Sequence, residues 1–418
     1  MARPRPAPPP RAALAAAALA ALALAPRAAS AQDPPALPSC ADPVARPRVV
    51  YAAGSSALRP FLGVVATLLA QDETPYTLVY QAQGSCTGVG YMTATDPAEQ
   101  RIYDIPASGG ARSNYAVYYA DGEAVECTLG PGGQVVDVGI SDVFASGCDA
   151  TLPPDVEDYT GPIQAMTFVV GARSSQYAIS AEAAYLAFGL GGDRGRLAPW
   201  SDPSKFFVRN SSSGTQQMIA RAINVPAASW WGADQGGSGG VLDKLLNLLT
   251  ESGAEPAIGI LSADFADGER GNIRILAFQD WGQPCGFLPD STPESFDKRN
   301  VRDGHYPIWG PAHLFARVDA NRLPVSAGAA ALLRRFSSTR LDQTLLDAEV
   351  SGGVVPQCAM QVTRDEEMGP MSSYSRDYQC DCYFEFKATG RSDCQTCALP
   401  ADCPASAPAC NYGFCEVN

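Results

Sequence analysis

The chain has 418 residues, of which 46% are hydrophobic and 18% are charged, so it is long enough to build two lobes that each bury a core. Its 44 acidic and 30 basic side chains give a formal net charge of −14 at pH 7. Because no basic stripe runs along the sequence, we do not expect the protein to bind nucleic acid.

The N-terminus has the pattern of a secretory signal peptide. Arginines at positions 3, 5 and 11 precede an Ala/Leu-rich run over residues 12–25, and the small residues 29–31 follow it. This run is too short to span a bilayer, and no later stretch is long and apolar enough to do so. We therefore predict that residues 1–31 are a signal peptide and that the mature chain, without a membrane span, is periplasmic, secreted or held at the cell surface. Removal of the four arginines in this segment changes the formal net charge from −14 to −18.

Three predicted strands in the first part of the chain each end in a turn rich in Ser, Gly or Asp. In open α/β sheets, ligands bind at the carboxyl ends of the strands, so these turns are expected to converge on one crevice. Each turn taken alone is also typical of an ordinary turn or helix cap. The strands are predicted over residues 48–53, 76–81 and 135–140, and the turns over residues 54–56, 84–88 and 141–142.

Two more features lie between these turns. An amphipathic helix is predicted over residues 58–69, with Pro60 in its first turn. Residues 91–134 have no clear period and predict a surface excursion with a hairpin around residues 115–119. A disulfide from Cys127 to Cys148 or Cys86 is expected to hold this excursion.

An anion-binding pattern begins in the middle of the chain, at Arg209. A strand predicted over residues 205–208 leads into it, and the Ser/Gly-rich residues that follow open a helix over residues 216–223. The free N–H groups and the positive dipole end of a helix stabilise an oxyanion, and a guanidinium suits phosphate or carboxylate. A Ser/Gly loop before a helix is more often a plain cap, so this stretch indicates a ligand site only together with the turns described above.

The rest of the chain continues as mixed α/β without an internal repeat. We predict helices over residues 180–188, 241–249 and 327–336 and strands over residues 162–170, 257–261, 273–278 and 313–316. A Gly-rich segment, residues 236–240, precedes the second of these helices.

Enzyme motifs are present but incomplete. Residues 236–240 match the nucleophile pattern G-x-S-x-G, yet residues 230–235 do not predict the strand that must precede it. Residues 295–298 match S-x-x-K without its companion motifs, and the two histidines, His305 and His313, lack the spacing of a helical zinc pair. We therefore predict no catalytic residue, no metal and no cofactor, and keep an exported phosphatase-type hydrolase as the least favoured alternative.

Taken in order, these segments resemble the substrate-binding proteins of ABC phosphate importers, a family with the type II periplasmic-binding-protein fold. The matching motifs are AGSS at 53–56, YQAQGS at 80–85, GISD at 139–142, WSDP and RNSSSGT within 200–215, AIGI at 257–260, YPI at 306–308 and GVVP at 353–356. Together they cover roughly residues 48–357. The resemblance implies two α/β lobes joined by hinge strands, with residues 45–160 and 308–357 in lobe I and residues 161–307 in lobe II.

The resemblance also implies a ligand and the residues that hold it. One phosphate, or a similar tetrahedral oxyanion, would be captured between the lobes for ABC-type import, and Asp142 would accept a hydrogen bond from a protonated ligand oxygen. A carboxylate there penalises a fully ionised anion such as sulfate. The implied ligand-binding set is Ser56, Ser85, Asp142, Arg209, Ser213, Gly214 and Thr215.

Three positions depart from the family pattern. Ala57 stands where the family usually has an aromatic residue, and Cys86 and Thr87 replace small residues in the second ligand loop. These departures, together with the acidic charge and an added C-terminal segment, keep an alternative open. In that alternative the protein is a secreted or surface-attached phosphate-binding protein that serves no permease.

The chain changes character after Pro356. Eight cysteines lie between Cys358 and Cys415, in a stretch poor in aliphatic residues. So small a segment cannot bury enough apolar surface without cross-links. We predict a disulfide-stapled tail over residues 358–418 with four bridges, which an exported chain favours over zinc. With five earlier cysteines, the total of 13 leaves one thiol unpaired or paired to another chain.

Overall fold

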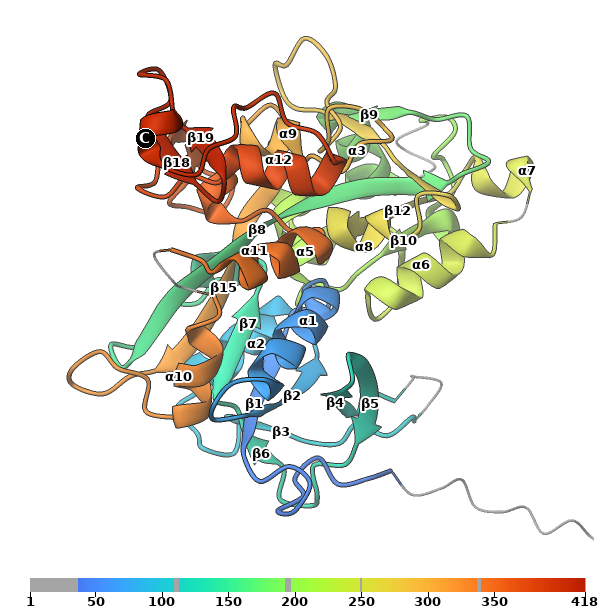
Figure 1. Cartoon of the computed structure of the whole chain (residues 1–418). Coiled ribbons are helices and arrows are strands. Elements are labelled where there is room, and N and C mark those ends of the chain that lie inside the picture. Colours follow the sequence, from blue (N-terminus) through green and yellow to red (C-terminus); the bar gives the residue numbers. More distant parts are fainter. Residues whose placement is uncertain (1–36, 109–112, 192–196, 249, 337–339, 418) are drawn as a thin grey trace, which may run out of the picture. The chain divides into compact units, whose positions relative to one another are not determined.

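The computed structural model describes residues 37–108, 113–191, 197–248, 250–336 and 340–417. The predicted signal peptide, residues 1–31, lies outside these ranges. Within them, the dominant feature is one eleven-stranded mixed sheet covered by helices (Figure 1). None of the helices in these ranges combines the length and the apolarity that a membrane crossing requires.

One half of the sheet has three parallel strands at its centre. These are β1 (Val49–Gly54), β2 (Thr77–Ala82) and β7 (Val138–Ser141), with β1 in the middle. Val50 and Ala52 pack on one face of β1, whereas Ala53 packs on the other face. Both faces are therefore buried, which explains the nearly continuous apolar runs of these strands.

A hairpin extends this half beyond β2. Its strands are β4 (Ala116–Ala120) and β5 (Glu123–Cys127), and β4 pairs antiparallel with β2. Asp121 and Gly122 between them have φ angles of 51° and 83°, as a two-residue hairpin turn requires. The hairpin predicted around residues 115–119 is confirmed, and it belongs to the main sheet.

The other half contains a second parallel set, and two long strands join the halves. The parallel strands are β10 (Phe206–Val208), β11 (Ala233–Asp234) and β12 (Ile258–Ser262). The long strands are β8 (Val156–Gly171) and β15 (Trp309–Arg317), which pair antiparallel with each other. β15 also pairs with β7, and β8 pairs with β12 and with β13 (Ile273–Ile275).

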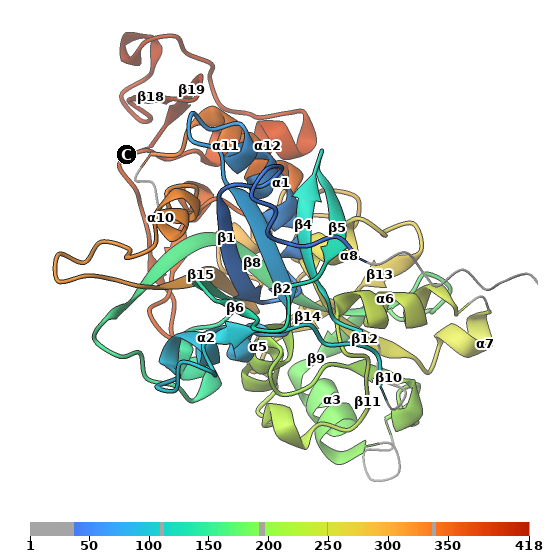
Figure 2. The same cartoon turned by 90° about the horizontal axis from the view of Figure 1, so that it is seen from below.

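The resulting strand order is β11-β10-β12-β8-β15-β7-β1-β2-β4-β5, with β13 beside β8 (Figures 1 and 2). Two α/β halves are thus linked by β8 and β15, which confirms the predicted two-lobed α/β fold with connecting strands. The boundaries that assign residues 45–160 and 308–357 to one lobe and residues 161–307 to the other stay a prediction.

Five of the described helices begin within a few residues of the end of a strand of the sheet. They are α1 (Arg59–Ala70) after β1, α2 (Ser85–Thr93) after β2, α5 (Gly214–Ala222) after β10, α6 (Ser238–Leu246) after β11 and α8 (Ala263–Asp267) after β12. The sequence pattern predicts α1, α5 and most of α6 but not α2. Two further helices are α10 (Ala327–Leu333) and α11 (Gln343–Ser351).

Three predicted elements are divided in the structure. The strand expected over 135–140 becomes β6 (Gln134–Val135) and β7, and the strand expected over 273–278 becomes β13 and β14 (Ala277–Gln279). The helix expected over 180–188 starts as α3 (Ala181–Ala184) and continues as a π-helical turn. The breaks in the two strands mark a change of pairing partner, which local periodicity cannot indicate.

The cysteines of the tail form four disulfides, as predicted. They are Cys358–Cys380, Cys382–Cys394, Cys397–Cys410 and Cys403–Cys415. The sulfurs of Cys397, Cys403 and Cys415 lie within 4.8 Å of one another, but each belongs to a disulfide and offers no thiolate to zinc.

The earlier cysteines pair differently from the prediction. Cys40 pairs with Cys127, and Cys86 pairs with Cys148, so the expected bridge from Cys127 to Cys148 or Cys86 is wrong. The unpaired thiol is Cys285, which is exposed.

The tail shares a core with the body of the protein. It contains the short hairpin β16 (Val362–Thr363) and β17 (Ser372–Ser373), the helix α12 (Asp381–Thr389) and the hairpin β18 (Ala409–Asn411) and β19 (Phe414–Glu416). Tyr383 and Phe384 of α12 belong to the same buried cluster as Trp309 of β15 and Leu345 of α11. Packing against the body therefore adds to the disulfides in holding the tail.

Candidate functional site

The loop after β1 and the loop after β10 meet at Arg209. This residue is 3% exposed. Its Nη2 donates to Ser56 Oγ at 3.0 Å, and its Nη1 donates to Ser238 Oγ at 3.1 Å. The hydroxyls of Ser56 and Ser238 are themselves 3.3 Å apart. Because Ser56 belongs to the first half of the sheet and Arg209 and Ser238 to the second, this guanidinium joins the two halves.

Asp142 and Ser85 form a second group beside the first. Ser85, the first residue of α2, donates from Oγ to Asp142 Oδ2 at 3.1 Å, and the same hydroxyl accepts from Asp142 N at 3.2 Å. Gly214 lies against this pair, since a Cβ on Gly214 would come within 2.3 Å of Ser85 Oγ and 2.7 Å of Asp142 Oδ2. The N-terminus of α5 therefore faces the first-half carboxylate, and only glycine fits there.

Ser213 and Thr215 flank Gly214 and are both buried. Ser213 is the N-cap of α5 and accepts from Gln216 N at 3.4 Å, which is the capping role that the sequence left open. The Thr215 hydroxyl has no hydrogen-bond partner among the described residues. The structure thus brings the seven predicted residues together, while their role as ligands stays a proposal.

The two halves also contact each other directly beside this group. Cys86 N donates to Ser212 O at 2.9 Å, and a Cβ on Gly84 would meet Ser212 Oγ at 2.7 Å. Gly84 has a φ of 105°, a conformation that favours glycine. Ala57 is one of the three positions that depart from the pattern described above. Its backbone N–H donates to Ser55 Oγ at 3.0 Å, and this hydrogen bond stabilises the turn.

The electrostatics of the site are set by one buried acid and one buried base. Burial raises the pKa of Asp142 above its ordinary value, while the hydroxyls of Ser55 and Ser85 and the charges of Arg209 and His313 act in the opposite direction. Burial lowers the pKa of Arg209 to about 10, although the nearby carboxylates of Asp142 and Asp234 raise it. Arg209 therefore stays cationic at neutral pH, and Asp142 keeps a proton more easily than an exposed aspartate does.

Three buried polar atoms of the site have no hydrogen-bond partner within the described part of the chain. They are Asp142 Oδ1, Arg209 Nε and Thr215 Oγ1. An unpaired buried polar atom costs about 1–3 kcal/mol, so these three atoms are the ones of the site that a polar ligand could satisfy. The set can donate through Arg209 and Thr215 and accept through Asp142, which matches an oxyanion that carries a proton.

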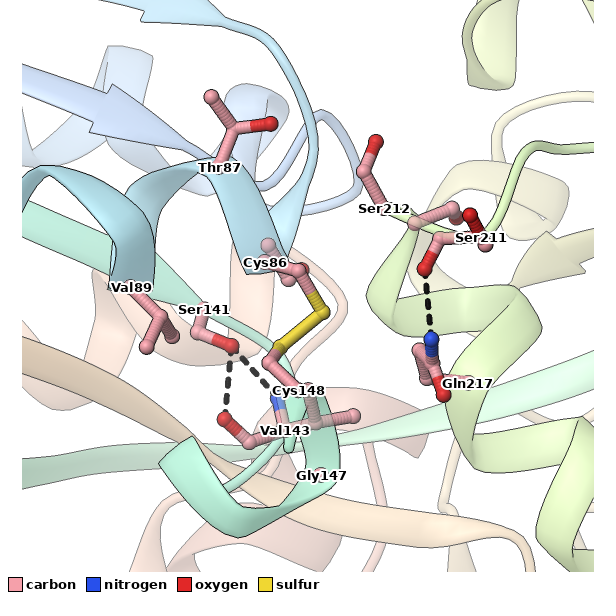
Figure 3. Close-up of a disulfide and its surroundings, with 12 residues drawn as sticks. Cys86, Thr87, Val89, Ser141, Val143, Gly147, Cys148, Ser211, Ser212 and Gln217 are labelled. Carbon is pink, nitrogen blue, oxygen red and sulfur yellow. Dashed lines mark hydrogen bonds between the residues drawn. A yellow bond between two sulfur atoms is a disulfide. The ribbon is translucent and has the colours of Figure 1, made fainter. Parts of the chain in front are cut away.

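A disulfide links the two loops of the first half that carry Ser85 and Asp142. Cys86, next to Ser85 in α2, is bonded to Cys148, at the end of the loop that begins with Asp142 (Figure 3). The Ser141 hydroxyl holds the start of this loop by donating to Val143 O at 2.7 Å and accepting from Val143 N at 3.1 Å. Figure 3 also shows Ser211 and Ser212 of the second half across from Cys86. Cys86, which replaces a small residue of the pattern described above, therefore cross-links two loops of the site.

Ser238 is the site residue that the sequence prediction misses. It is the first residue of α6 and follows the short strand β11. The prediction that residues 230–235 contain no strand is therefore wrong. The signal for its role is the same as at Ser213: a Ser/Gly turn between a strand and a helix. Among the described residues, neither histidine is hydrogen-bonded to this serine, whose hydroxyl bonds instead to Arg209 and Ser56.

The second enzyme motif also has a structural explanation. Lys298 Nζ lies 2.6 Å from Asp267 and 3.0 Å from Asp290, and both contacts hold it charged. The Ser295 hydroxyl bonds instead to Thr292 and Asp297. An S-x-x-K arrangement requires the lysine as a partner of the serine, so this match is coincidental.

No family model matches the chain, and no curated protein matches it either. One similar solved structure, from Clostridium perfringens, is described as a putative phosphate ABC transporter substrate-binding protein with bound phosphate. Its sequence is 13% identical and its TM-score is 0.48, and the match covers 74% of this chain and 99% of that chain. An ABC-type phosphate transport receptor from Vibrio cholerae has 13% identity and a TM-score of 0.43, covering 73% and 99%. A reduced form of OxyR from N. meningitidis has 9% identity and a TM-score of 0.38, covering 74% and 99%.

Proposed function

We propose that this chain is an exported solute-binding protein that captures phosphate, or a similar tetrahedral oxyanion, for ABC-type import. The observation that carries the proposal is the buried Arg209, which joins serines from both halves of the sheet beside Asp142. A buried cation held between two loops, with unpaired polar atoms around it, suits a small anion enclosed by both halves.

The helix starts supply the rest of the anion site. α2, α5 and α6 begin at Ser85, Gly214 and Ser238, so their free N–H groups and positive dipole ends are directed toward one region. In a chain with an excess of acidic residues, such local donors must outweigh the repulsion of the overall charge.

Asp142 gives the site its selectivity in this proposal. A carboxylate repels a fully ionised anion, but it accepts a hydrogen bond from hydrogen phosphate. Sulfate brings no proton at neutral pH and would leave Asp142 Oδ1 unpaired against a negative oxygen. The protein is therefore expected to prefer phosphate over sulfate.

The test is equilibrium binding of radiolabelled phosphate to the purified protein, with sulfate as competitor. We expect binding at micromolar phosphate, little competition by sulfate, and about a hundredfold weaker binding in Arg209→Ala, because a charge-assisted pair is lost. Arg173→Ala, which removes an exposed arginine, is the matched control and should bind like the wild type. Absence of micromolar binding by the wild-type protein would refute the proposal.

Two further measurements separate the alternatives. Sustained turnover of a phosphate ester that survives both Arg209→Ala and Asp142→Ala would point to a hydrolase with its chemistry elsewhere. Loss of phosphate uptake in cells that lack the chain would support import. Unchanged uptake, with binding intact, would favour a binding protein that serves no permease.

A further inference from the structure

The tail touches the loop that carries Asp142. The hairpin of β16 and β17 turns through residues 364–371, and Glu367 lies in this turn. Glu367 Oε2 accepts a hydrogen bond from Phe144 N at 3.0 Å, two residues beyond Asp142. The same oxygen lies 3.3 Å from the position of a Cβ on Gly147, so the carboxylate rests against both the start and the end of the loop.

The hairpin that presents Glu367 is anchored at several points. Arg364 Nη2 donates to Pro307 O at 3.0 Å, and its guanidinium lies 4.2 Å from the centre of the Trp309 ring. Gln361 N donates to Arg302 O at 2.9 Å. The disulfide between Cys358 and Cys380 closes the segment that contains the hairpin. The carboxylate is thus held in place by the body of the protein and by a bridge of the tail.

Other groups bind the rest of the loop, but none of them accepts the hydrogen bond that Phe144 N donates to Glu367. Arg221 of α5 donates from Nη2 to Gly147 O at 2.9 Å, and the disulfide to Cys86 holds Cys148. The Phe144 ring packs on His313 at 4.3 Å between ring centres, which orients the side chain but satisfies no backbone group. Among the described residues, Glu367 is the only acceptor for Phe144 N.

We propose that the C-terminal tail is a positioning element of the anion site and that it acts through Glu367. The inference rests on the proposed function, because it concerns how Asp142 is presented to the anion. A loop shift of about 1 Å would move Asp142 Oδ1 out of hydrogen-bond range of a ligand held by Arg209. The tail therefore contributes to anion affinity without touching the anion.

The charges around Glu367 give the contact a pH dependence. Burial raises the pKa of Glu367 to about 6, while His313 of β15, Arg221 of α5 and Arg364 of the hairpin lower it. Asp158 pairs with His313, and the charge of Asp280 raises the pKa of Arg364. These two acids therefore reduce the effect of His313 and Arg364 on the pKa of Glu367. Below about pH 6 the carboxylate gains a proton and becomes a weaker acceptor for Phe144 N. Phosphate affinity should fall with it.

The test compares variants of the full chain in phosphate binding from pH 5 to pH 8. We expect Glu367→Ala to bind phosphate about tenfold more weakly than the wild type at pH 7.5, and Glu367→Gln, which keeps only an uncharged acceptor oxygen, to bind it about threefold more weakly. Dividing the wild-type affinity by that of Glu367→Gln at each pH removes the ligand's own protonation. This ratio should be about three at pH 7.5 and should approach one when the pH is lower than about 6, because a protonated carboxyl and an amide are both uncharged acceptors. The matched controls are Glu366→Ala and Glu366→Gln, at an exposed position of the same turn.

Hydrogen exchange of the Phe144 amide gives a readout that is independent of the ligand. It should accelerate in Glu367→Ala and stay unchanged in Glu366→Ala. If the wild type binds phosphate and Glu367→Ala binds it equally, the positioning role is overturned while the proposed function stands. If Glu367→Ala does not fold, a flat wild-type to Glu367→Gln ratio across the pH range overturns it instead. Absence of phosphate binding by the wild type would remove the proposed function and this inference with it.

Discussion

Single residues decide how closely the two halves approach at the anion site. Gly214 lets the start of α5 touch Ser85 and Asp142, and Gly84 lets the start of α2 touch Ser212. Neither position has room for a Cβ. The sequence shows glycines in turns, but which of them are sterically required follows from what lies opposite.

At this scale we predict that Gly214→Ala disrupts the site. The added methyl group would overlap Ser85 Oγ, so the loop carrying Asp142 must shift; we expect at least tenfold weaker phosphate binding and a loss of about 1–3 kcal/mol in the free energy of unfolding. Gly271→Ala is the control, because a Cβ at this exposed position would have no other atom within 4 Å. Equal binding by the two variants would show that the contact at Gly214 is unimportant.

Asp142→Asn should change the selectivity of the site. An amide at this position no longer repels a fully ionised anion and can donate a hydrogen bond to it. The ratio of phosphate to sulfate affinity should therefore fall by about tenfold or more, measured by competition with labelled phosphate. Asp393→Asn, at an exposed position of the tail, should leave the ratio unchanged. An unaltered ratio in Asp142→Asn would place the selectivity elsewhere.

At the scale of elements, α2 shows why local pattern is not enough. It contains Gly88 and Gly90, which weaken a helix, and its sequence predicts a turn. Gly88 packs so tightly on the sheet that a Cβ would lie 2.6 Å from Ile140 O and 2.9 Å from Ala53 O. The packing of α2 on β1 and β7 stabilises a helix that its own residues disfavour.

The disulfide between Cys86 and Cys148 gives a second prediction at this scale. It closes a segment with a sequence separation of 62 residues, so Cys86→Ser with Cys148→Ser should lower the free energy of unfolding by about 3–4 kcal/mol. Phosphate affinity should also fall, because Ser85 and Asp142 lose their covalent link. Denaturant unfolding and phosphate binding measure the two effects. Cys285→Ser, which removes the unpaired exposed thiol, should change neither quantity.

At the scale of the whole molecule, buried acids predict how stability depends on pH. Burial raises the pKa of Asp264 to about 7 and that of Glu349 to about 8. An acid whose pKa is higher in the folded state contributes its full stability below the unfolded pKa, and the contribution is lost as the pH rises through the folded pKa. The free energy of unfolding should therefore fall from about pH 5 to about pH 9, by at most about 1.4 kcal/mol per pH unit for each group.

Glu349→Gln tests this prediction. The variant should lose the part of the slope above about pH 7, because it has no proton to release there. Denaturant unfolding with the disulfides intact, at several pH values, measures the slope. Glu366→Gln, at an exposed position, should follow the wild-type curve. Parallel curves for wild type and Glu349→Gln would show that Glu349 is ionised in the folded protein.

Local sequence was enough to predict most strands of the main sheet, the helices α1, α5, α10 and most of α6, the α/β class, the disulfide-stapled tail and the loops that contain the seven candidate ligand-binding residues. The strands, helices and loops depend on periodicity, caps and turn residues within a few positions of one another, and the tail is indicated by its clustered cysteines, so one sequence suffices to predict them. Which groups meet, in contrast, follows from the three-dimensional path of the chain. Arg209 contacts Ser238 across 29 positions and Ser56 across 153, and Phe144 contacts Glu367 across 223. The path of β8 and β15 brings such distant residues together, and no local pattern encodes it.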